Sequence, residues 1–212
     1  MKRGASFSVL VGTVALLYLK GGVYISIGLA AALFIMLFEW RKMNPLKSSA
    51  LYILGNIYIA IPIICWIADL TISTLHKYIP FEFIVILGIV SCSDTFAFIG
   101  GSLIGGAKMA PKISPSKTWS GAACGIIVPS ILAYVLFNHG LPRAIITGII
   151  ALSGVFGDLI ESKAKRILNV KDSGTAIPGH GGVLDRLDSF LFASYIYFLL
   201  RALFNFYYTA DL

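Results

Sequence analysis

The chain has 212 residues, of which 58% are hydrophobic and 13% are charged, and its formal net charge is +7. This apolar share is well above that of a soluble domain, so the composition excludes an ordinary soluble enzyme and indicates a polytopic membrane protein. The positive charge does not call for a nucleic-acid partner, because membrane topology alone enriches cytoplasmic loops in Lys and Arg.

In chain order, the apolar stretches predict about seven transmembrane helices, and six to nine would fit the pattern. The stretch 3–39 is too long for one span, since 35 residues of helix would reach about 52 Å across a core of about 30 Å. Lys20, Gly21 and Gly22 lie near its middle and favour a hairpin of two short spans. Further spans are expected at 48–70, 82–105, 118–138, 143–160 and 189–208. The predicted fold class is all-α.

The basic residues predict the orientation of these spans. With the N-terminus in the cytoplasm, thirteen of the 17 Lys and Arg residues fall in cytoplasmic segments, as the positive-inside rule requires. We expect residues 1–80 to form N-terminal transmembrane helices. Residues 81–212 should form the catalytic transmembrane region, with cytoplasmic loops at 106–118 and 161–188.

Polar residues concentrate first in residues 91–121. Asp94 lies well inside a predicted span, where a charged group costs about 2.5–3.5 kcal/mol, so a functional role is favoured over packing against neighbouring hydroxyls. Four glycines between residues 100 and 106 resemble a phosphate loop without matching one, and close helix packing, with Gly101 and Gly105 suitably spaced, is equally open. Lys112 and Lys117 follow on a proline-stiffened loop rich in hydroxyls, which suits phosphate oxygens.

The second polar stretch is residues 157–189. A helix continuing out of the sixth span would present Asp158, Glu161 and Lys165 on one face, and Asp158 at a helix C-terminus needs a cation. Asp185 and Asp188 would share a face just before the last span, beside glycines that let the backbone approach a ligand. Hard carboxylates among lysines and hydroxyls indicate Mg²⁺ and phosphate chemistry, whereas zinc is disfavoured because no Cys or His cluster exists.

These motifs resemble those of the CDP-diacylglycerol synthase family, also called phosphatidate cytidylyltransferases. The resemblance covers roughly residues 85–205. It is carried by Ser93-Asp94-Thr95, Ala110-Pro111-Lys112-x-Ser114-Pro115-x-Lys117-Thr118-Trp119, Gly157-Asp158-Leu159-x-Glu161-Ser162-x-x-Lys165-Arg166, Lys171-Asp172-x-Gly174 and Pro178-x-His180-Gly181-Gly182-x-x-Asp185-Arg186-x-Asp188. The chain departs from the family pattern at Ser102, Gly106, Ser116 and Ser120. The metal-binding half of the family motif is intact in this chain, so we expect an active enzyme.

The resemblance implies transfer of CMP from CTP to phosphatidic acid, giving CDP-diacylglycerol and pyrophosphate. It implies Mg²⁺ as cofactor, with room for a second, monovalent cation, and a homodimer among membrane lipids, in a bacterial inner membrane with the active site facing the cytoplasm. We assign catalysis to Asp158, Lys165, Asp185 and Asp188, and metal ligation to Asp158 and Asp188 with Asp185 assisting. Substrate contacts are expected from Asp94, Lys117, Ser162, Arg166, Lys171, His180 and Arg186.

Three alternatives stay open at this point. The first is a related nucleotidyl or phosphoryl transferase that acts on another lipid, such as an archaeal or polyprenyl lipid. The second is a transporter or channel with Asp94 lining an ion path, and the third is an inactive scaffold.

Overall fold

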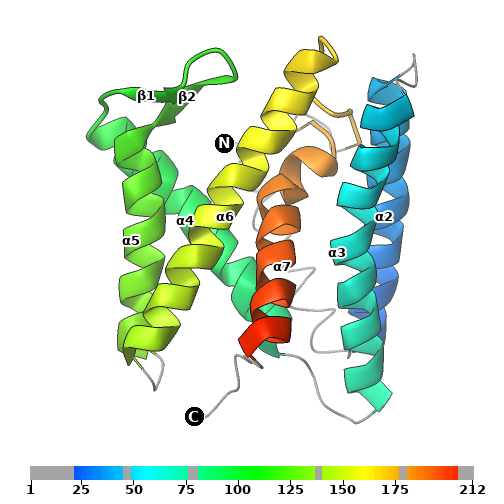
Figure 1. The fold of residues 1–212 in the computed structure, drawn as a ribbon, viewed down its shortest axis with the longest axis horizontal. Coiled ribbons are helices and arrows are strands. Elements are labelled where there is room, and N and C mark those ends of the chain that lie inside the picture. The colour runs from blue at the N-terminus through cyan, green and yellow to red at the C-terminus, as the bar shows by residue number, and fades with distance from the viewer. Residues whose placement is uncertain (1–21, 45–48, 76–80, 137–139, 177–180, 205–212) are drawn as a thin grey trace. The chain divides into compact units, whose positions relative to one another are not determined.

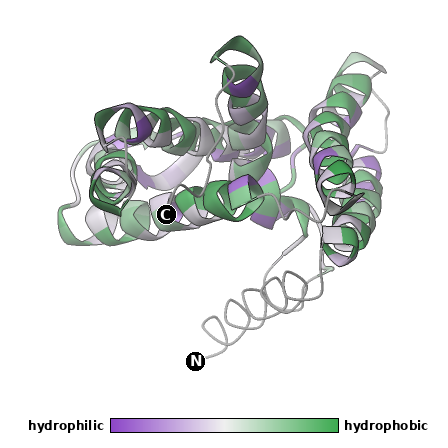
Figure 2. Cartoon of the chain, turned by 90° about the horizontal axis from the view of Figure 1, so that it is seen from below, coloured by the Kyte–Doolittle hydropathy of each residue, from purple (hydrophilic) through white to green (hydrophobic). Residues whose placement is uncertain are grey.

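The structure, a computed structural model, describes residues 22–44, 49–75, 81–136, 140–176 and 181–204. Within these ranges it contains six long helices and one small β-hairpin (Figure 1). All six helices are long and apolar enough to cross a membrane, and hydrophobic residues predominate along them (Figure 2). The prediction of an all-α polytopic membrane protein is therefore confirmed. The first span expected in the stretch 3–39 falls on residues outside the described part.

The chain divides into two compact units. The first consists of residues 1–80 and 172–185, and its helices are α2 (Gly22–Met43) and α3 (Ser49–Leu75), which pack against each other. The Trp40 indole N–H donates to the Tyr52 carbonyl oxygen at 3.1 Å. A side chain at Gly55 would overlap the Trp40 ring, so this glycine lets the two helices approach closely.

The second unit consists of residues 81–171 and 186–212. Its elements are α4 (Phe81–Leu103), β1 (Lys108–Ala110), β2 (Ser114–Thr118), α5 (Trp119–Leu136), α6 (Gly140–Ile167) and α7 (Leu184–Phe204), whose first two residues belong to the other unit. Helix α5 packs against both α4 and α6, and α4 also contacts α6 (Figure 1). The rings of Phe83 on α4 and Phe190 on α7 meet edge to face, with centroids 5.7 Å apart. The polar ends of α6 and α7 that concern function lie at the hairpin end of these helices (Figure 1).

Small residues hold α4 against α5. A Cβ at Gly121 would lie 2.6 Å from the Ala97 carbonyl oxygen, and one at Gly125 would lie 2.8 Å from the Ser93 carbonyl oxygen. Gly100 packs on Cys124 in the same interface. Close helix packing therefore accounts for the first part of the glycine-rich stretch. Gly105 and Gly106 instead form the turn after α4, with φ of +68° and +103°, so Gly105 lies outside the helix and does not share a packing face of α4 with Gly101.

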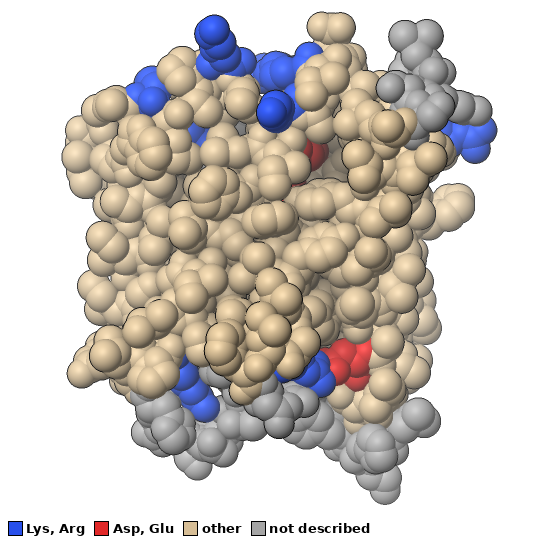
Figure 3. Space-filling model, viewed as in Figure 1, with Lys and Arg blue, Asp and Glu red and all other residues tan. Residues whose placement is uncertain are grey.

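The expected cytoplasmic loop 106–118 contains the β-hairpin, in which Lys108 pairs with Thr118 and Ala110 with Ser114. The Ser120 hydroxyl donates to the Gly105 carbonyl oxygen and lies 3.0 Å from the Thr118 hydroxyl. Serine at position 120 thus ties the start of α5 to the turn after α4. Basic side chains gather at the edge of the surface over this hairpin and the end of α6, beyond a broad uncharged band (Figure 3).

Two helix boundaries differ from the expected spans in ways that matter for the site. Helix α6 has 28 residues and is about 42 Å long, so its last turns extend past a hydrocarbon core of about 30 Å. This confirms the prediction of a helix that continues out of its span with charged residues on it. Helix α7 begins at Leu184, earlier than the expected 189, and so includes Asp185 and Asp188.

Candidate active site

The central interaction of the site is an ion pair between Lys117 at the end of β2 and Asp158 on α6. The Lys117 Nζ lies 2.6 Å from the Asp158 Oδ2, and the two side chains are 23% and 31% exposed. The Ser162 hydroxyl, one turn further along α6, donates to the Asp158 Oδ1 at 3.1 Å. Helix α6 runs nine residues past Asp158, so the expected position of Asp158 at a helix C-terminus is wrong; the cation beside it is Lys117, which the hairpin delivers.

Asp188 enters the same cluster from α7. It is buried, at 9% exposure, and the Ser189 backbone N–H donates to its Oδ1 at 2.7 Å. A Cβ at Gly157 would lie 2.6 Å from the Asp188 carbonyl oxygen, so α6 and α7 can meet here only because residue 157 lacks a side chain. Asp188 interacts electrostatically with Asp158.

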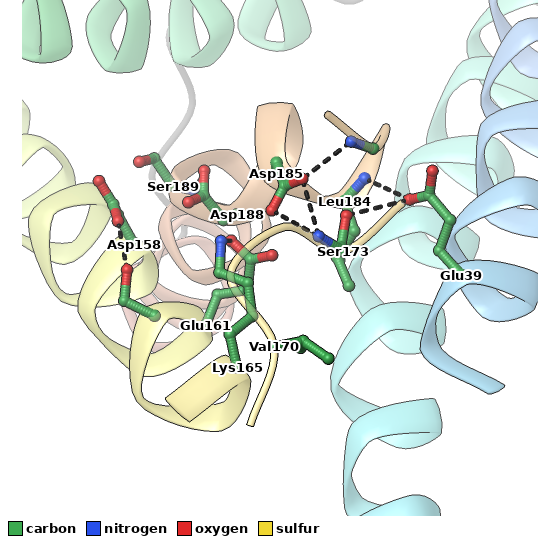
Figure 4. A network of polar contacts seen from close by, with 12 residues as sticks. Glu39, Asp158, Glu161, Lys165, Val170, Ser173, Leu184, Asp185, Asp188 and Ser189 are labelled. Atoms are coloured by element: carbon green, nitrogen blue, oxygen red, sulfur yellow. Dashed lines mark hydrogen bonds and ion pairs between the residues drawn. The ribbon is translucent and has the colours of Figure 1, made fainter. Parts of the chain in front are cut away.

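A second carboxylate of α6, Glu161, lies beside Asp188. It is buried at 4% exposure and pairs with the Lys165 Nζ at 3.3 Å (Figure 4). Lys165 also interacts with Asp188. The sequence places Glu161 on this face of α6 but predicts no role for it. Its i, i+4 spacing to Lys165 was the signal that could have identified it.

Asp94 reaches the cluster from within α4. It interacts electrostatically with Asp188, Asp158 and Lys117, and its side chain is within hydrogen-bonding reach of Ser189. Because Asp94 is nine residues from the end of α4, it lies about 14 Å along the helix from that end. The cost of a charge at this depth is offset by the polar site it joins, as the functional interpretation of Asp94 requires.

The cluster as a whole carries more acidic than basic groups. Asp94, Asp158, Glu161 and Asp188 face two ammonium groups, Lys117 and Lys165. Neighbouring carboxylates repel one another unless a proton or a cation lies between them. In the described part of the chain no three His, Cys, Asp or Glu side chains form a ligand set by themselves. Mg²⁺ needs only one or two carboxylates, because waters and substrate phosphates complete its shell, so the donors fit that ion.

The remaining predicted contacts lie elsewhere or outside the described residues. Arg166 is exposed, and its guanidinium donates to the carbonyl oxygens of Ile113 at 3.3 Å and Val170 at 3.4 Å, which ties the end of α6 to the hairpin. Lys171 and Arg186 are exposed. His180 lies outside the described residues.

Asp185 has partners that the sequence interpretation did not foresee. It accepts hydrogen bonds from the Ser173 backbone N–H at 2.9 Å and from the Gly182 backbone N–H at 2.8 Å. These bonds give it a structural role at the start of α7. Its assistance in metal ligation stays a prediction.

Comparison with known proteins agrees with this chemistry. Residues 52–204 match the family model of the cytidylyltransferase family. A protein of Rickettsia bellii named phosphatidate cytidylyltransferase is 40% identical over 204 residues, covering 90% of this chain and 85% of the relative. Proteins of the same name from Rickettsia conorii and Brucella abortus are 39% identical over 178 residues and 33% identical over 208 residues. They cover 78% and 92% of this chain, and 75% and 72% of the relatives.

The class that fold and comparison define is a membrane-embedded nucleotidyltransferase. The chain belongs to the cytidylyltransferase family. The predicted enzyme class is confirmed, and the transporter alternative is set aside.

Proposed function

We propose that this protein transfers CMP from CTP to phosphatidic acid, releasing pyrophosphate and forming CDP-diacylglycerol. The observation that carries the proposal is the Lys117–Asp158 ion pair beside Asp188, at the end of helices that cross the membrane. A site at the ends of membrane-crossing helices suits a lipid substrate with a polar headgroup, because its acyl chains can stay in the bilayer while the headgroup reaches the site. The name shared by the relatives from Rickettsia and Brucella supports the same acceptor.

The reaction needs charge neutralisation more than proton transfer. A phosphate monoester has its second pKa near 6, so the phosphatidate oxygen is largely ionised at neutral pH and attacks without a general base. That oxygen bonds to the α-phosphorus of CTP while the bond from this phosphorus to the β-phosphate bridging oxygen breaks, and pyrophosphate leaves with that electron pair. The Lys117 and Lys165 ammonium groups neutralise part of the phosphate charge and position the two anions.

The carboxylates of Asp158 and Asp188 would hold Mg²⁺, with Ser162 beside them and Asp185 assisting as first expected. When bound, the ion would neutralise phosphate charge that two lysines cannot balance alone. A second, monovalent cation would fit the same excess of carboxylates. Asp94 would orient Ser189 and the groups around Asp188 from the membrane side.

We further propose that the site faces the cytoplasm of a bacterial inner membrane, where CTP is available. The expected orientation supports this, since the basic loops beside the site would then be cytoplasmic. Arg166, Lys171, His180 and Arg186 would contact the nucleotide or its phosphates from those loops. The homodimer implied by the family resemblance remains a prediction that mass measurement in lipid nanodiscs would test.

The acceptor can be tested with the purified protein in lipid nanodiscs. CTP labelled at the α-phosphate is supplied with Mg²⁺ and, in separate reactions, phosphatidate, a polyprenyl phosphate or diacylglycerol. We expect a chloroform-soluble labelled product with phosphatidate at a rate at least about tenfold above the other acceptors. Equal or faster labelling of the polyprenyl phosphate would contradict the proposed acceptor.

A further inference from the structure

A buried glutamate of the N-terminal unit holds the segment that leads into α7. Glu39 lies near the end of α2 and is 4% exposed. Its carboxylate accepts hydrogen bonds from the Val183 backbone N–H at 3.0 Å and from the Leu184 backbone N–H at 2.9 Å. The Ser173 hydroxyl lies 3.4 Å from the same group (Figure 4). One carboxylate thus contacts both described ends of the segment 172–185.

Glycines in the segment 172–185 leave room for the Glu39 carboxylate. A Cβ at Gly174 would lie 2.7 Å from the Glu39 Oε1, and one at Gly182 would lie 2.6 Å from the Oε2, so neither position has room for a side chain. Gly181 adopts a left-handed φ of +81°, which a side chain would strain. Gly174 and Gly182 therefore let the backbone close around Glu39, and Gly181 supplies the left-handed turn, in addition to any approach to a ligand.

The charge of Glu39 matches its surroundings. The N–H groups of the first turn of a helix lack intrahelical partners and carry partial positive charge, so a carboxylate there is stabilised. Val183 and Leu184 present these groups at the start of α7. Because Glu39 occupies them, they are not available to a substrate phosphate. The carboxylate acts on the helix and not on the nucleotide.

Glu39 binds the N-terminal end of the helix that carries Asp188. Leu184 and Asp188 are four residues apart on one continuous helix, so fixing the first turn of α7 fixes the direction and rotation from which Asp188 projects. We propose that Glu39 is a positioning residue for the cytidylyl transfer, acting through the Val183 and Leu184 amides on Asp188. This inference rests on the proposed function, but the hold that Glu39 exerts on α7 can be measured without it.

The kinetic test compares Glu39→Ala and Glu39→Gln with Arg41→Gln, an exposed position on the same turns of α2. A misplacement of about 1 Å can cost about 10²-fold, so we expect Glu39→Ala to lower kcat by about that factor. The KM for CTP should change less than threefold. Glu39→Gln keeps one acceptor oxygen and should lose less, and Arg41→Gln should match the wild type. If Glu39→Ala does not fold, the near-isosteric Glu39→Gln variant carries the comparison.

A cross-linking reporter measures the position of α7 directly. A Cβ at Gly154 would lie 3.7 Å from the Ser189 Cβ, a separation that suits a disulfide. Gly154→Cys and Ser189→Cys are introduced after the free cysteines, Cys65, Cys92 and Cys124, are replaced by alanine. We expect rapid cross-linking with Glu39 or Arg41→Gln present, and at least a threefold slower rate with Glu39→Ala or Glu39→Gln.

The two readouts separate the possible failures. Unchanged cross-linking in the Glu39 variants would overturn the inference, whether or not kcat falls, because Glu39 would then not act through α7. Slower cross-linking with kcat unchanged would also overturn it, because the position of α7 would not matter for the reaction. If the wild type makes no CDP-diacylglycerol, the proposed function and the positioning role both fail, while cross-linking still shows whether Glu39 holds α7.

Discussion

Replacing Lys117 with methionine separates the catalytic value of the Lys117–Asp158 pair from its structural value. The two side chains are 23% and 31% exposed, and ion pairs with this access to solvent contribute up to about 1 kcal/mol to stability. In the reaction, Lys117 would face phosphate charge that develops as the α–β bond breaks. Removing one such charge-assisted contact costs about 10²–10³ in kcat, or about 2.7–4 kcal/mol. Activity should therefore fall far more than stability.

The assay for Lys117→Met is the initial rate of chloroform-soluble cytidine product at saturating phosphatidate, with thermal unfolding measured on the same preparation. Lys163→Met is the control, because Lys163 is an exposed lysine of α6 and its loss should leave both quantities near wild type. We expect kcat to drop at least about 100-fold in Lys117→Met. A rate within threefold of wild type in a folded variant would refute the assignment, and a loss that merely follows unfolding would show a structural role.

Three further outcomes follow from the site and the packing. Asp188→Asn should abolish transfer while leaving a folded, membrane-inserted protein, as shown by rate and thermal unfolding; near wild-type rates would remove Asp188 from the mechanism. Chelation with EDTA should stop the reaction and added Mg²⁺ should restore it, whereas full activity in EDTA would exclude a divalent ion. Gly121→Ala should lower stability by about 1–3 kcal/mol because its Cβ would meet the Ala97 carbonyl oxygen, and Gly88→Ala, which meets nothing within 4 Å, is the matched control. Equal melting temperatures for these two variants would contradict the packing of α4 on α5.

The local parts of the site could be predicted from the sequence, because helix geometry fixes them. Asp158, Glu161 and Lys165 fall on one face of α6 by spacing alone, and Asp188 falls at the start of an apolar helix. Asp94 was identified by its cost within an apolar span. Each of these inferences needed only the period of a helix or the energetics of burying charge.

The contacts between distant segments could not be predicted in this way. Lys117 meets Asp158 because a hairpin follows α4, and the sequence pattern indicated only a proline-stiffened loop there. Asp185 was assigned to a metal, yet its position three residues after Gly182 is typical of a carboxylate that reaches back to the first N–H groups of a helix. The carboxylate–amide bonds at the start of α7 were therefore partly visible in the sequence.

Glu39 was missed although a signal for it was present. A carboxylate in the last turns of a helix opposes the helix dipole, as Glu39 does in α2; the same argument was applied to Asp158 only because its span was expected to end near residue 160. Its partners lie 134 to 145 residues away, so no local pattern could name them. The unfavourable position of the Glu39 carboxylate predicts that it has a partner, and only the structure shows that this partner is the start of α7.

The most direct measurement of the central claim follows two labels of CTP with the purified protein, Mg²⁺ and phosphatidate, alongside Asp188→Asn. If CMP is transferred at the cluster of Lys117, Asp158 and Asp188, label from the α-phosphate enters the lipid phase and label from the γ-phosphate appears only in pyrophosphate. Asp188→Asn should show neither. Label from the γ-phosphate in the lipid, or an α-label that enters the lipid as fast with Asp188→Asn as with wild type, would contradict the account.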